Sequence, residues 1–166
     1  DTILRHSIEE ELDRGGQVFC VHPRIRGIWA TAEYLEKLAP RARLGVAHGK
    51  MKEEDLEKVL LDFVRKEIDV LLSTSIIEAG LDIPNANTII VFDADHFGLA
   101  QLYQLRGRVG RSGLQAKAYL IVREGQMTPE AVKRLEAVQE SGLGSGFRLA
   151  KRDLEIRGGG DVLGKN

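Results

Sequence analysis

The sequence predicts an α/β fold built on a doubly wound, mostly parallel sheet. Two observations indicate this: short apolar runs bounded by turn or polar residues, and helical patterns lying between the runs. The apolar runs are Val18–Val21, Leu44–Ala47, Val70–Leu72, Ile89–Phe92 and Ala118–Val122. None of them alternates apolar and polar residues, so we expect each to be a strand that is buried on both faces. Strands that alternate with helices imply right-handed crossovers, which place helices on both faces of the sheet.

Apolar residues recur at helical spacing in three segments that precede or separate these runs. The segment 4–12 ends at Gly15-Gly16, and the segment 28–39 ends at Pro40. The third segment, 53–64, begins with acidic residues and is followed by basic ones, an order that complements the helix dipole. Glycine and proline are common helix stops, so we expect three separate helices here.

The pattern changes after residue 124, where no further strand is expected. Thr128 precedes Pro129, which is typical of a helix start with threonine as the cap and proline in the first turn. A helix, a glycine-rich bend and a second helix are then expected in turn, over Glu130–Glu140, Ser141–Gly146 and Phe147–Ile156. We therefore divide the sequence into a sheet domain, 1–124, and an appended helical hairpin, 125–166, which is incomplete at its end.

Composition limits the classes of function. The 166 residues suit one compact domain with an appendage, and the net charge of −1 provides no broad basic face for nucleic acid. Any DNA contact must therefore come from local arginines, backbone N–H groups and helix ends. The single cysteine, Cys20, excludes an internal disulfide and a cysteine-based zinc site, and we predict no metal site.

Two expectations concern the cell and the chain as a whole. No apolar run approaches the roughly 20 residues of a membrane-spanning helix, so we expect a cytoplasmic protein without a membrane partner. The first residue is Asp1 and not methionine, so we expect a fragment of a longer protein.

The segment Gln101–Arg111 combines a helical pattern with arginines that lie beside glycines. At about 100° per residue, its polar and basic side chains fall on one side of a helix, namely Gln101, Gln104, Arg108 and Arg111. An amphipathic surface helix explains this pattern without any function. Guanidinium groups with no acidic residue nearby, next to glycines that allow close backbone approach, also suit phosphate oxygens. The pattern alone leaves both interpretations open.

The segment Ser73–Pro84 follows an expected strand, at the edge where open α/β sheets bind ligands. The hydroxyls of its first three residues can cap the next helix and leave N–H groups for an anion such as a DNA phosphate. Plain N-capping explains the same residues. Asp82, which follows Gly80, can hold a sugar hydroxyl or simply order the turn.

His48 and Gly49 follow another expected strand, at the same edge of the sheet. They are candidates for a ligand contact, although a lone histidine is more often a structural residue. Cys20 lies within an apolar strand and is expected to belong to the core.

Together these segments resemble the second RecA-like domain of superfamily 2 helicases and translocases, a domain of the P-loop NTPase type. In the family's order, Val18–Pro23 resembles motif IV, Thr74–Pro84 resembles motif V and Gln104–Arg111 resembles motif VI. Within the superfamily, Ala94–Leu102 is similar to the transcription-repair coupling family, with RecG-type helicases as close relatives. The stretch Asp153–Gly164 looks like the translocation module that both families share.

The resemblance implies a nucleotide site between two motor domains. Arg108 and Arg111 would be arginine fingers for the γ-phosphate of ATP, and Gln104 would help to read the phosphate state. Gly80 and Asp82 would line the nucleotide, with Asp82 near the ribose. The sequence contains no Gly-x-x-x-x-Gly-Lys-[Ser/Thr] segment, so ATP and Mg²⁺ would be held by a first RecA-like domain of the same polypeptide. We therefore expect the isolated fragment not to hydrolyse ATP.

The resemblance also implies movement along double-stranded DNA. The phosphodiester backbone would be contacted by Thr74, Ser75, His48 and Gly49, and the coupling hairpin would include Arg134 and Arg157. RNA polymerase and excision-repair proteins would be partners of other domains. One departure from the family is the segment Val21–Ile28, which is more basic than we expect for motif IV.

Other interpretations remain open from the sequence. A RecG-type fork-remodelling helicase uses the same chemistry on a different substrate. An RNA helicase domain should lack the hairpin that spans Arg134 and Arg157. A small-ligand-binding α/β module would bind a mononucleotide tightly and have no motor role.

Overall fold

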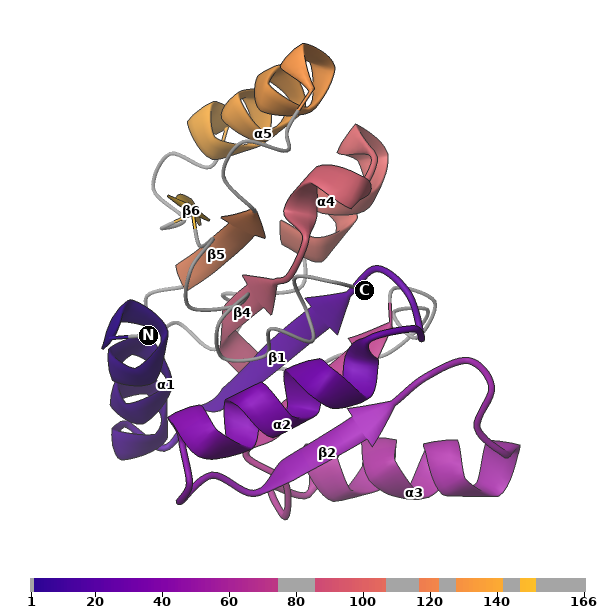
Figure 1. Cartoon of the computed structure of the whole chain (residues 1–166). Helices are drawn as coiled ribbons and strands as arrows, with labels where there is room; N and C mark the ends of the chain where they lie inside the picture. Colours follow the sequence, from indigo (N-terminus) through magenta and orange to yellow (C-terminus); the bar gives the residue numbers. More distant parts are fainter. Residues whose placement is uncertain (1, 75–85, 107–116, 123–127, 142–146, 152–166) are drawn as a thin grey trace.

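The computed structural model describes residues 2–74, 86–106, 117–122, 128–141 and 147–151. They form a six-stranded, all-parallel sheet in the order β2-β3-β1-β4-β5-β6 (Figure 1). The predicted α/β fold with a doubly wound parallel sheet is therefore confirmed. The five predicted strands are also confirmed, over Gln17–His22 (β1), Leu44–Ala47 (β2), Val70–Thr74 (β3), Ala86–Val91 (β4) and Lys117–Val122 (β5).

The first three predicted helices are present. Helix α1 (Thr2–Asp13) precedes β1, α2 (Ile28–Leu38) joins β1 to β2, and α3 (Glu53–Val64) joins β2 to β3. Figure 1 shows α2 in front of the sheet and α3 behind it. Because β3 lies between β2 and β1, the chain first moves outward, returns, and then crosses β1 to reach β4. The loops at the carboxyl ends of such strands are where open α/β sheets bind ligands.

Alternate strand residues pack into two core layers, one on each face of the sheet. In β1, Phe19 and Val21 belong to the cluster that contains Phe63 of α3, whereas Val18 and Cys20 belong to the cluster under α1 and α2. Full burial of an apolar side chain such as Phe63 contributes about 1.5–3 kcal/mol relative to exposure. Cys20 is fully buried, and burial raises the pKa of its thiol, so its predicted core position is confirmed.

The edge strand β2 departs from one expectation. Gly45 and Ala47 are buried, but Leu44 and Val46 are only half buried. The prediction that this strand is buried on both faces is therefore wrong. Leu44 and Val46 pack against the cluster under α2, but β2 pairs with β3 alone and lies at the end of the described sheet, so one flank remains in solvent.

The first half of the appended segment folds as predicted. Helix α5 (Pro129–Ser141) covers the helix expected over Glu130–Glu140. Thr128 Oγ1 accepts the N–H of Ala131 at 3.1 Å, which is the capping bond that its position before a proline predicts.

The second half of this segment does not fold as predicted. Residues Phe147–Lys151 form strand β6, so the expectation of a helix over Phe147–Ile156 is wrong for this part. β6 pairs in parallel with β5, from Ala118 opposite Phe147 to Val122 opposite Lys151. The physical reason is the free edge of β5, whose N–H and C=O groups need partners that a helix could not supply. The remainder of the predicted helix and the end of the hairpin lie outside the described residues.

Helix α4 (Leu99–Arg106) is the described part of the helix predicted over Gln101–Arg111. Gln101 Oε1 accepts the N–H of Gly98 at 2.9 Å, which closes the helix start in the manner of a capping box. Leu102 is fully buried and Gln101 is exposed, as the amphipathic pattern predicts.

A buried carboxylate fixes α1 to the sheet. Glu11 is 1% exposed, and its Oε1 accepts hydrogen bonds from Thr88 Oγ1 at 2.5 Å and from Arg14 Nη2 at 2.7 Å. Arg14 Nε also donates to Glu11 Oε2 at 3.1 Å. Gly16 provides the space for this carboxylate, because a Cβ at that position would lie 1.8 Å from Oε2. The charge-assisted hydrogen bond from Thr88 therefore joins α1 to β4.

Candidate nucleic-acid interface

Polar residues end three neighbouring strands at the carboxyl edge of the sheet. The register pairs His22 of β1 with Thr74 of β3, and Ala47 of β2 with Ser73 of β3. His48 follows Ala47 and so continues this edge next to Thr74. Figure 1 shows the loops after β1 and β2 leaving the arrowheads on the same side of the molecule. Two of the predicted DNA contacts, His48 and Thr74, therefore meet at one edge.

His48 braces the turn that follows β2. Its N–H donates to Met51 Sδ at 3.3 Å, its carbonyl oxygen accepts the N–H of Met51 at 3.2 Å, and its Nδ1 accepts the N–H of Lys50 at 3.2 Å. An Nδ1 that accepts a hydrogen bond leaves the proton of the neutral imidazole on Nε2. His48 can therefore donate through Nε2, as a contact to a phosphate oxygen requires. Gly49 is exposed beside it.

His22 braces the turn that follows β1. Its Nδ1 lies 2.7 Å from the carbonyl oxygen of Arg24, and because a carbonyl oxygen can only accept, Nδ1 is the donor in this hydrogen bond. His22 is 4% exposed, so the ring stabilises the turn from inside. Gly27 has a φ of 87°, a left-handed conformation that favours glycine, and its carbonyl oxygen accepts the N–H of Thr31 at 3.1 Å. The chain is thereby turned sharply into α2.

The two turns meet at an aromatic contact. Trp29, in the first turn of α2, packs edge-to-face against His48, with ring centroids 6.2 Å apart and planes at 86°. Its side chain is nevertheless 61% exposed. Trp29 was not predicted as a surface residue, because a tryptophan beside an apolar helical stripe is equally consistent with a core position.

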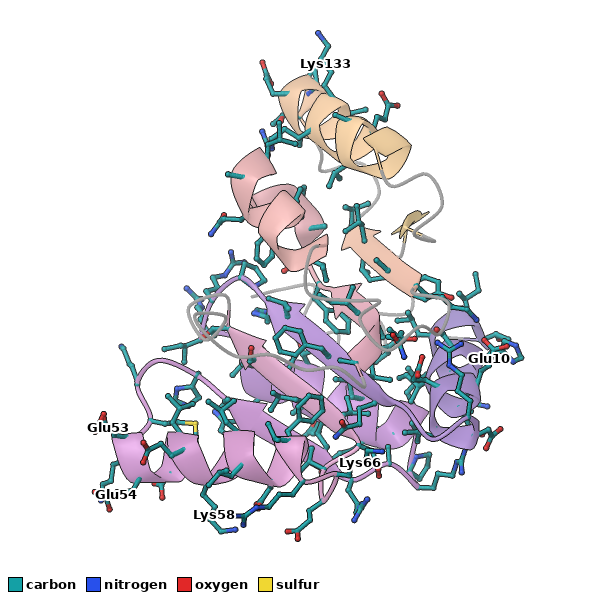
Figure 2. All side chains as sticks on the ribbon, turned by 180° about the vertical axis from the view of Figure 1, so that it is seen from behind. Glu10, Glu53, Glu54, Lys58, Lys66 and Lys133 are labelled. Atoms are coloured by element: carbon teal, nitrogen blue, oxygen red, sulfur yellow. The ribbon has the colours of Figure 1, made fainter. Side chains whose placement is uncertain are left out.

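The same two turns carry four exposed cations, Arg24, Arg26, Lys50 and Lys52. Within the described residues, none of these four makes an ion pair. Neither turn contains an acidic residue, and acidic residues resume at Glu53 and Glu54, which Figure 2 shows at the outer end of α3. We call the four cations, together with His48 and Trp29, the basic edge.

The basic edge explains how a chain of net charge −1 can still attract a polyanion. The overall charge averages over the whole surface, whereas binding depends on the local field. A pattern in the sequence does indicate this site, since the segments 23–27 and 48–52 each contain two cations and no carboxylate. What the sequence did not show is that β1 and β2 bring these two segments to one edge.

Cations also gather at the opposite, amino edge of the sheet, but two arginines there are paired. Arg43 Nε and Nη2 each donate to Asp69 at 3.1 Å, and Arg41 Nη2 donates to Asp13 at 2.7 Å. Burial disfavours the charged form of Asp69, but hydrogen bonds from Arg43 outweigh it and lower the pKa of Asp69. We call Arg41, Arg43, Asp13 and Asp69 the paired edge.

A cavity of about 350 Å³ opens at the paired edge and is lined in part by Arg41, Arg43 and Lys66. Three cations around a cavity are a common arrangement for binding an anion. Here, however, the two guanidinium groups already donate to carboxylates of the protein, so most of their charge is neutralised within the fold. We therefore place the candidate interface at the basic edge.

Two further predicted residues have contacts of their own. Thr74 is 4% exposed, and its Oγ1 has no hydrogen-bond partner among the described residues. Arg134 Nη2 donates to the carbonyl oxygen of Asp95 at 3.0 Å, which ties α5 to the short 3-10 helix η2 (Ala94–His96). This contact is structural, and the coupling role of Arg134 stays a prediction.

The other predicted site residues cannot be placed in the same way. Gln104 lies on α4, although its side chain is not among those described. The residues outside the described part of the chain are Ser75, Gly80, Asp82, Arg108, Arg111 and Arg157. Their roles stay predictions. In the described part of the chain, no cluster of three or more metal-binding side chains occurs, and no helix has the length and hydrophobicity to cross a membrane.

The fold, with the basic edge at the carboxyl ends of its strands, is consistent with one class of protein. Residues 2–113 match the helicase conserved C-terminal domain family, and the chain belongs to that family. The resemblance to superfamily 2 helicases that the sequence motifs indicated is thereby confirmed.

Within this class, the chain is similar to transcription-repair-coupling factors. It is 54% identical to the factor of Bacillus subtilis over 164 residues, and 54% identical to that of Myxococcus xanthus over 166 residues. These matches cover 98% and 99% of this chain but 14% of each relative. The chain therefore spans about a seventh of the length of these relatives.

Solved structures support the same fold. A structure of RecG bound to a three-way DNA junction has a TM-score of 0.71 and 40% sequence identity, over 82% of this chain and 18% of that one. The Pyrococcus furiosus Hef helicase domain has a TM-score of 0.58 over 75% of this chain and 26% of that one. At 23% identity, the Hef structure supports the fold alone.

Proposed function

We propose that this chain is the second motor domain of an ATP-dependent, double-stranded-DNA translocase of the transcription-repair coupling type. The observation that carries the proposal is the basic edge, a set of cations without ion pairs among the described residues, at the carboxyl ends of the strands of a helicase C-terminal domain. The extended similarity to transcription-repair-coupling factors favours the coupling type.

The basic edge is suited to hold a DNA strand by its backbone. The guanidinium groups of Arg24 and Arg26 match phosphate oxygens, and Lys50 adds a further exposed charge. His48 contributes the Nε2 donor. Because backbone contacts carry no sequence information, we expect movement that does not depend on sequence. The proposed backbone contacts also include Gly49, Thr74 and Ser75.

The nucleotide site is proposed to lie between this domain and a first RecA-like domain of the same polypeptide. Arg108 and Arg111 would stabilise the charge that develops on the transferred phosphoryl group, and Gln104 would respond to the phosphate state. Gly80 and Asp82 would line the same pocket. ATP, with Mg²⁺ held by the first domain, would supply the free energy for domain closure. The segment that contains Arg134 and Arg157 would transmit this closure to the DNA.

A RecG-type fork-remodelling helicase is the second candidate, favoured by 40% identity to RecG over much of the chain. The two candidates share the chemistry of this domain and differ in what other domains bind. A domain that binds RNA polymerase would indicate coupling, with excision-repair proteins as further partners, whereas a domain that splits a fork would indicate RecG-type remodelling. In either case we place the protein in the cytoplasm, where it would act on DNA.

Arginine substitution tests the motor assignment in the full-length protein. Replacement of Arg108 or Arg111 with alanine should lower DNA-stimulated ATP turnover by at least about a thousandfold, because an arginine finger contributes on the order of 10³–10⁵ in rate. Circular dichroism should show an unchanged fold, and DNA affinity should stay within about twofold of the original. Steady-state ATPase assays provide the measurement.

Arg65→Ala is a matched control, because Arg65 is exposed just beyond the end of α3 and is not part of the basic edge. This variant should retain normal turnover. If Arg108→Ala and Arg111→Ala also retained near-normal turnover, the arginine-finger assignment would be wrong.

A further inference from the structure

Trp29 is a large aromatic residue that the core does not use. Its neighbour Ile28, the first residue of α2, is fully buried, whereas the side chain of Trp29 is 61% exposed. An exposed tryptophan forgoes the stabilisation that burial of its ring would give. The chain contains one tryptophan, and it lies at the basic edge. An exposed tryptophan that lies among cations therefore indicates that its side chain contacts a ligand.

Contacts on one side of the indole fix its position. His48 packs edge-to-face against Trp29, and the His48 ring is itself held by the N–H of Lys50. The left-handed turn at Gly27 sets where α2 begins, two residues before Trp29. The ring is thus braced by its neighbours while most of its surface remains open to a ligand.

Exposed cations close to this ring and to its histidine partner in the sequence indicate the chemistry of the ligand. Arg26 lies three residues before Trp29, and Lys50 lies two residues after the histidine that contacts it. An aromatic platform flanked by cations is the arrangement by which proteins hold unpaired nucleotides, since the ring stacks on a base while the cations contact phosphates. In a continuous duplex, both faces of each base are covered by neighbouring base pairs. The indole can therefore stack only where a base has left the duplex.

We propose that Trp29 stacks on an unpaired nucleotide of the strand held at the basic edge. The preferred substrate is then DNA that carries a single-stranded segment next to a duplex. This inference rests on the proposed DNA-binding function of the basic edge and adds a substrate class to it. Arg24, Arg26 and Lys50 hold the backbone of either substrate, whereas Trp29 distinguishes between them.

Fluorescence of the 166-residue chain tests the inference directly, because Trp29 is its sole tryptophan. The probes are a blunt, two-stranded DNA duplex without a loop, and the same duplex with an overhang of about ten thymidines, a length within the range of known single-strand sites. The overhang should quench the indole fluorescence, and the blunt duplex should change it little. Fluorescence anisotropy of labelled DNA should show that Trp29→Ala weakens binding to the overhang about tenfold, to the level of the blunt duplex. Trp29→Phe should restore part of the preference.

The controls separate stacking from loss of apolar surface and from loss of charge. Leu61→Ala removes a side chain that is 48% exposed on α3 and should not alter the preference for the overhang. Lys50→Gln should weaken binding to both probes equally. Lys66→Gln, at the amino edge of the sheet, should weaken neither (Figure 2).

The results of these measurements distinguish the stacking role of Trp29 from the backbone contacts and from DNA binding itself. If Lys50→Gln weakens binding and Trp29→Ala does not, the backbone contact stands and the role of Trp29 is overturned. If Trp29→Ala weakens binding to both probes equally, the substrate preference is overturned. If neither probe binds even at low salt, the DNA-binding function of the basic edge fails, and the stacking role fails with it.

Discussion

At the basic edge, Arg24, Arg26, Lys50 and Lys52 make no ion pair within the described residues, whereas at the paired edge Arg41 and Arg43 donate to carboxylates. Both groups of cations are exposed, and both lie at ends of the same strands. The two edges differ in whether carboxylates of the protein neutralise the positive charges. A cation that already has a carboxylate partner stabilises the fold weakly and attracts an anion weakly, because the partner cancels its field.

This contrast shows how to separate binding surfaces from structural ones in a chain of nearly neutral net charge. Counting arginines and lysines does not distinguish the two edges, and the cavity of about 350 Å³ lies at the paired edge. The presence or absence of an ion pair among the described residues does distinguish them. Variants at the two edges test this rule in DNA binding, and variants of two carboxylates, Glu11 and Asp69, test the structural side of the contrast with smaller effects.

Removal of two guanidinium groups should weaken DNA binding when they come from the basic edge, but not when they come from the paired edge. Arg24→Ala combined with Arg26→Ala should lower affinity for a duplex by about tenfold to a hundredfold, because each group contributes a charge-assisted hydrogen bond. The slope of log affinity against log salt should decrease by about 2, since two phosphate contacts are lost. A salt titration by fluorescence anisotropy measures both quantities.

The matched variant, Arg41→Ala combined with Arg43→Ala, removes the same charge from the paired edge. It should change affinity by less than about twofold and leave the salt slope unaltered, because these groups contact protein carboxylates. Equal loss of affinity in the two double variants would show that only total charge matters, and the contrast between the edges would be broken.

A second substitution concerns the buried carboxylate of Glu11 on α1. Glu11→Ala should lower the free energy of unfolding by about 1–2 kcal/mol, because Thr88 and Arg14 lose a hydrogen-bonded acceptor. DNA affinity of the folded protein should not change. Urea denaturation followed by circular dichroism measures the effect.

Glu9→Ala on the same helix is the control. The Glu9 side chain is 40% exposed, so its removal should alter stability by no more than about 0.5 kcal/mol. A similar loss in both variants would indicate that helix propensity, and not the buried contact, determines the result.

The smallest effect is expected from the ion pair of Asp69 and is seen best as a function of pH. A carboxylate with a lowered pKa in the folded protein contributes stability above its unfolded value of 3.8, and this contribution is lost as the pH falls through the folded value. Asp69→Asn should therefore cost less than about 1 kcal/mol at pH 7, because the pair is partly exposed. The difference between the two proteins should disappear as the pH falls well below 3.8 in urea denaturations. A difference that persisted at low pH would assign the effect to packing.

The sequence by itself determined the parts of this protein that depend on local patterns. Apolar runs located β1 to β5, and helical spacing, with glycine or proline after a helix and threonine before one, located α1, α2, α3 and α5. Short motifs in a set order identified the helicase family. These features are readable because strand and helix periodicity, and the residue types of a motif, depend on neighbours in the chain.

The tertiary structure decided which residues meet. Phe147–Lys151 has a pattern compatible with a helix, but the free edge of β5 makes it a strand. Likewise Arg41 and Asp13 are 28 residues apart, and Arg43 and Asp69 are 26 apart, so no local pattern could show that these arginines are paired. The same holds for the contact of Trp29 with His48, which requires that β1 and β2 end at one edge. Packing and charge pairing are long-range, and they determine which of several similar cations remains available to a ligand.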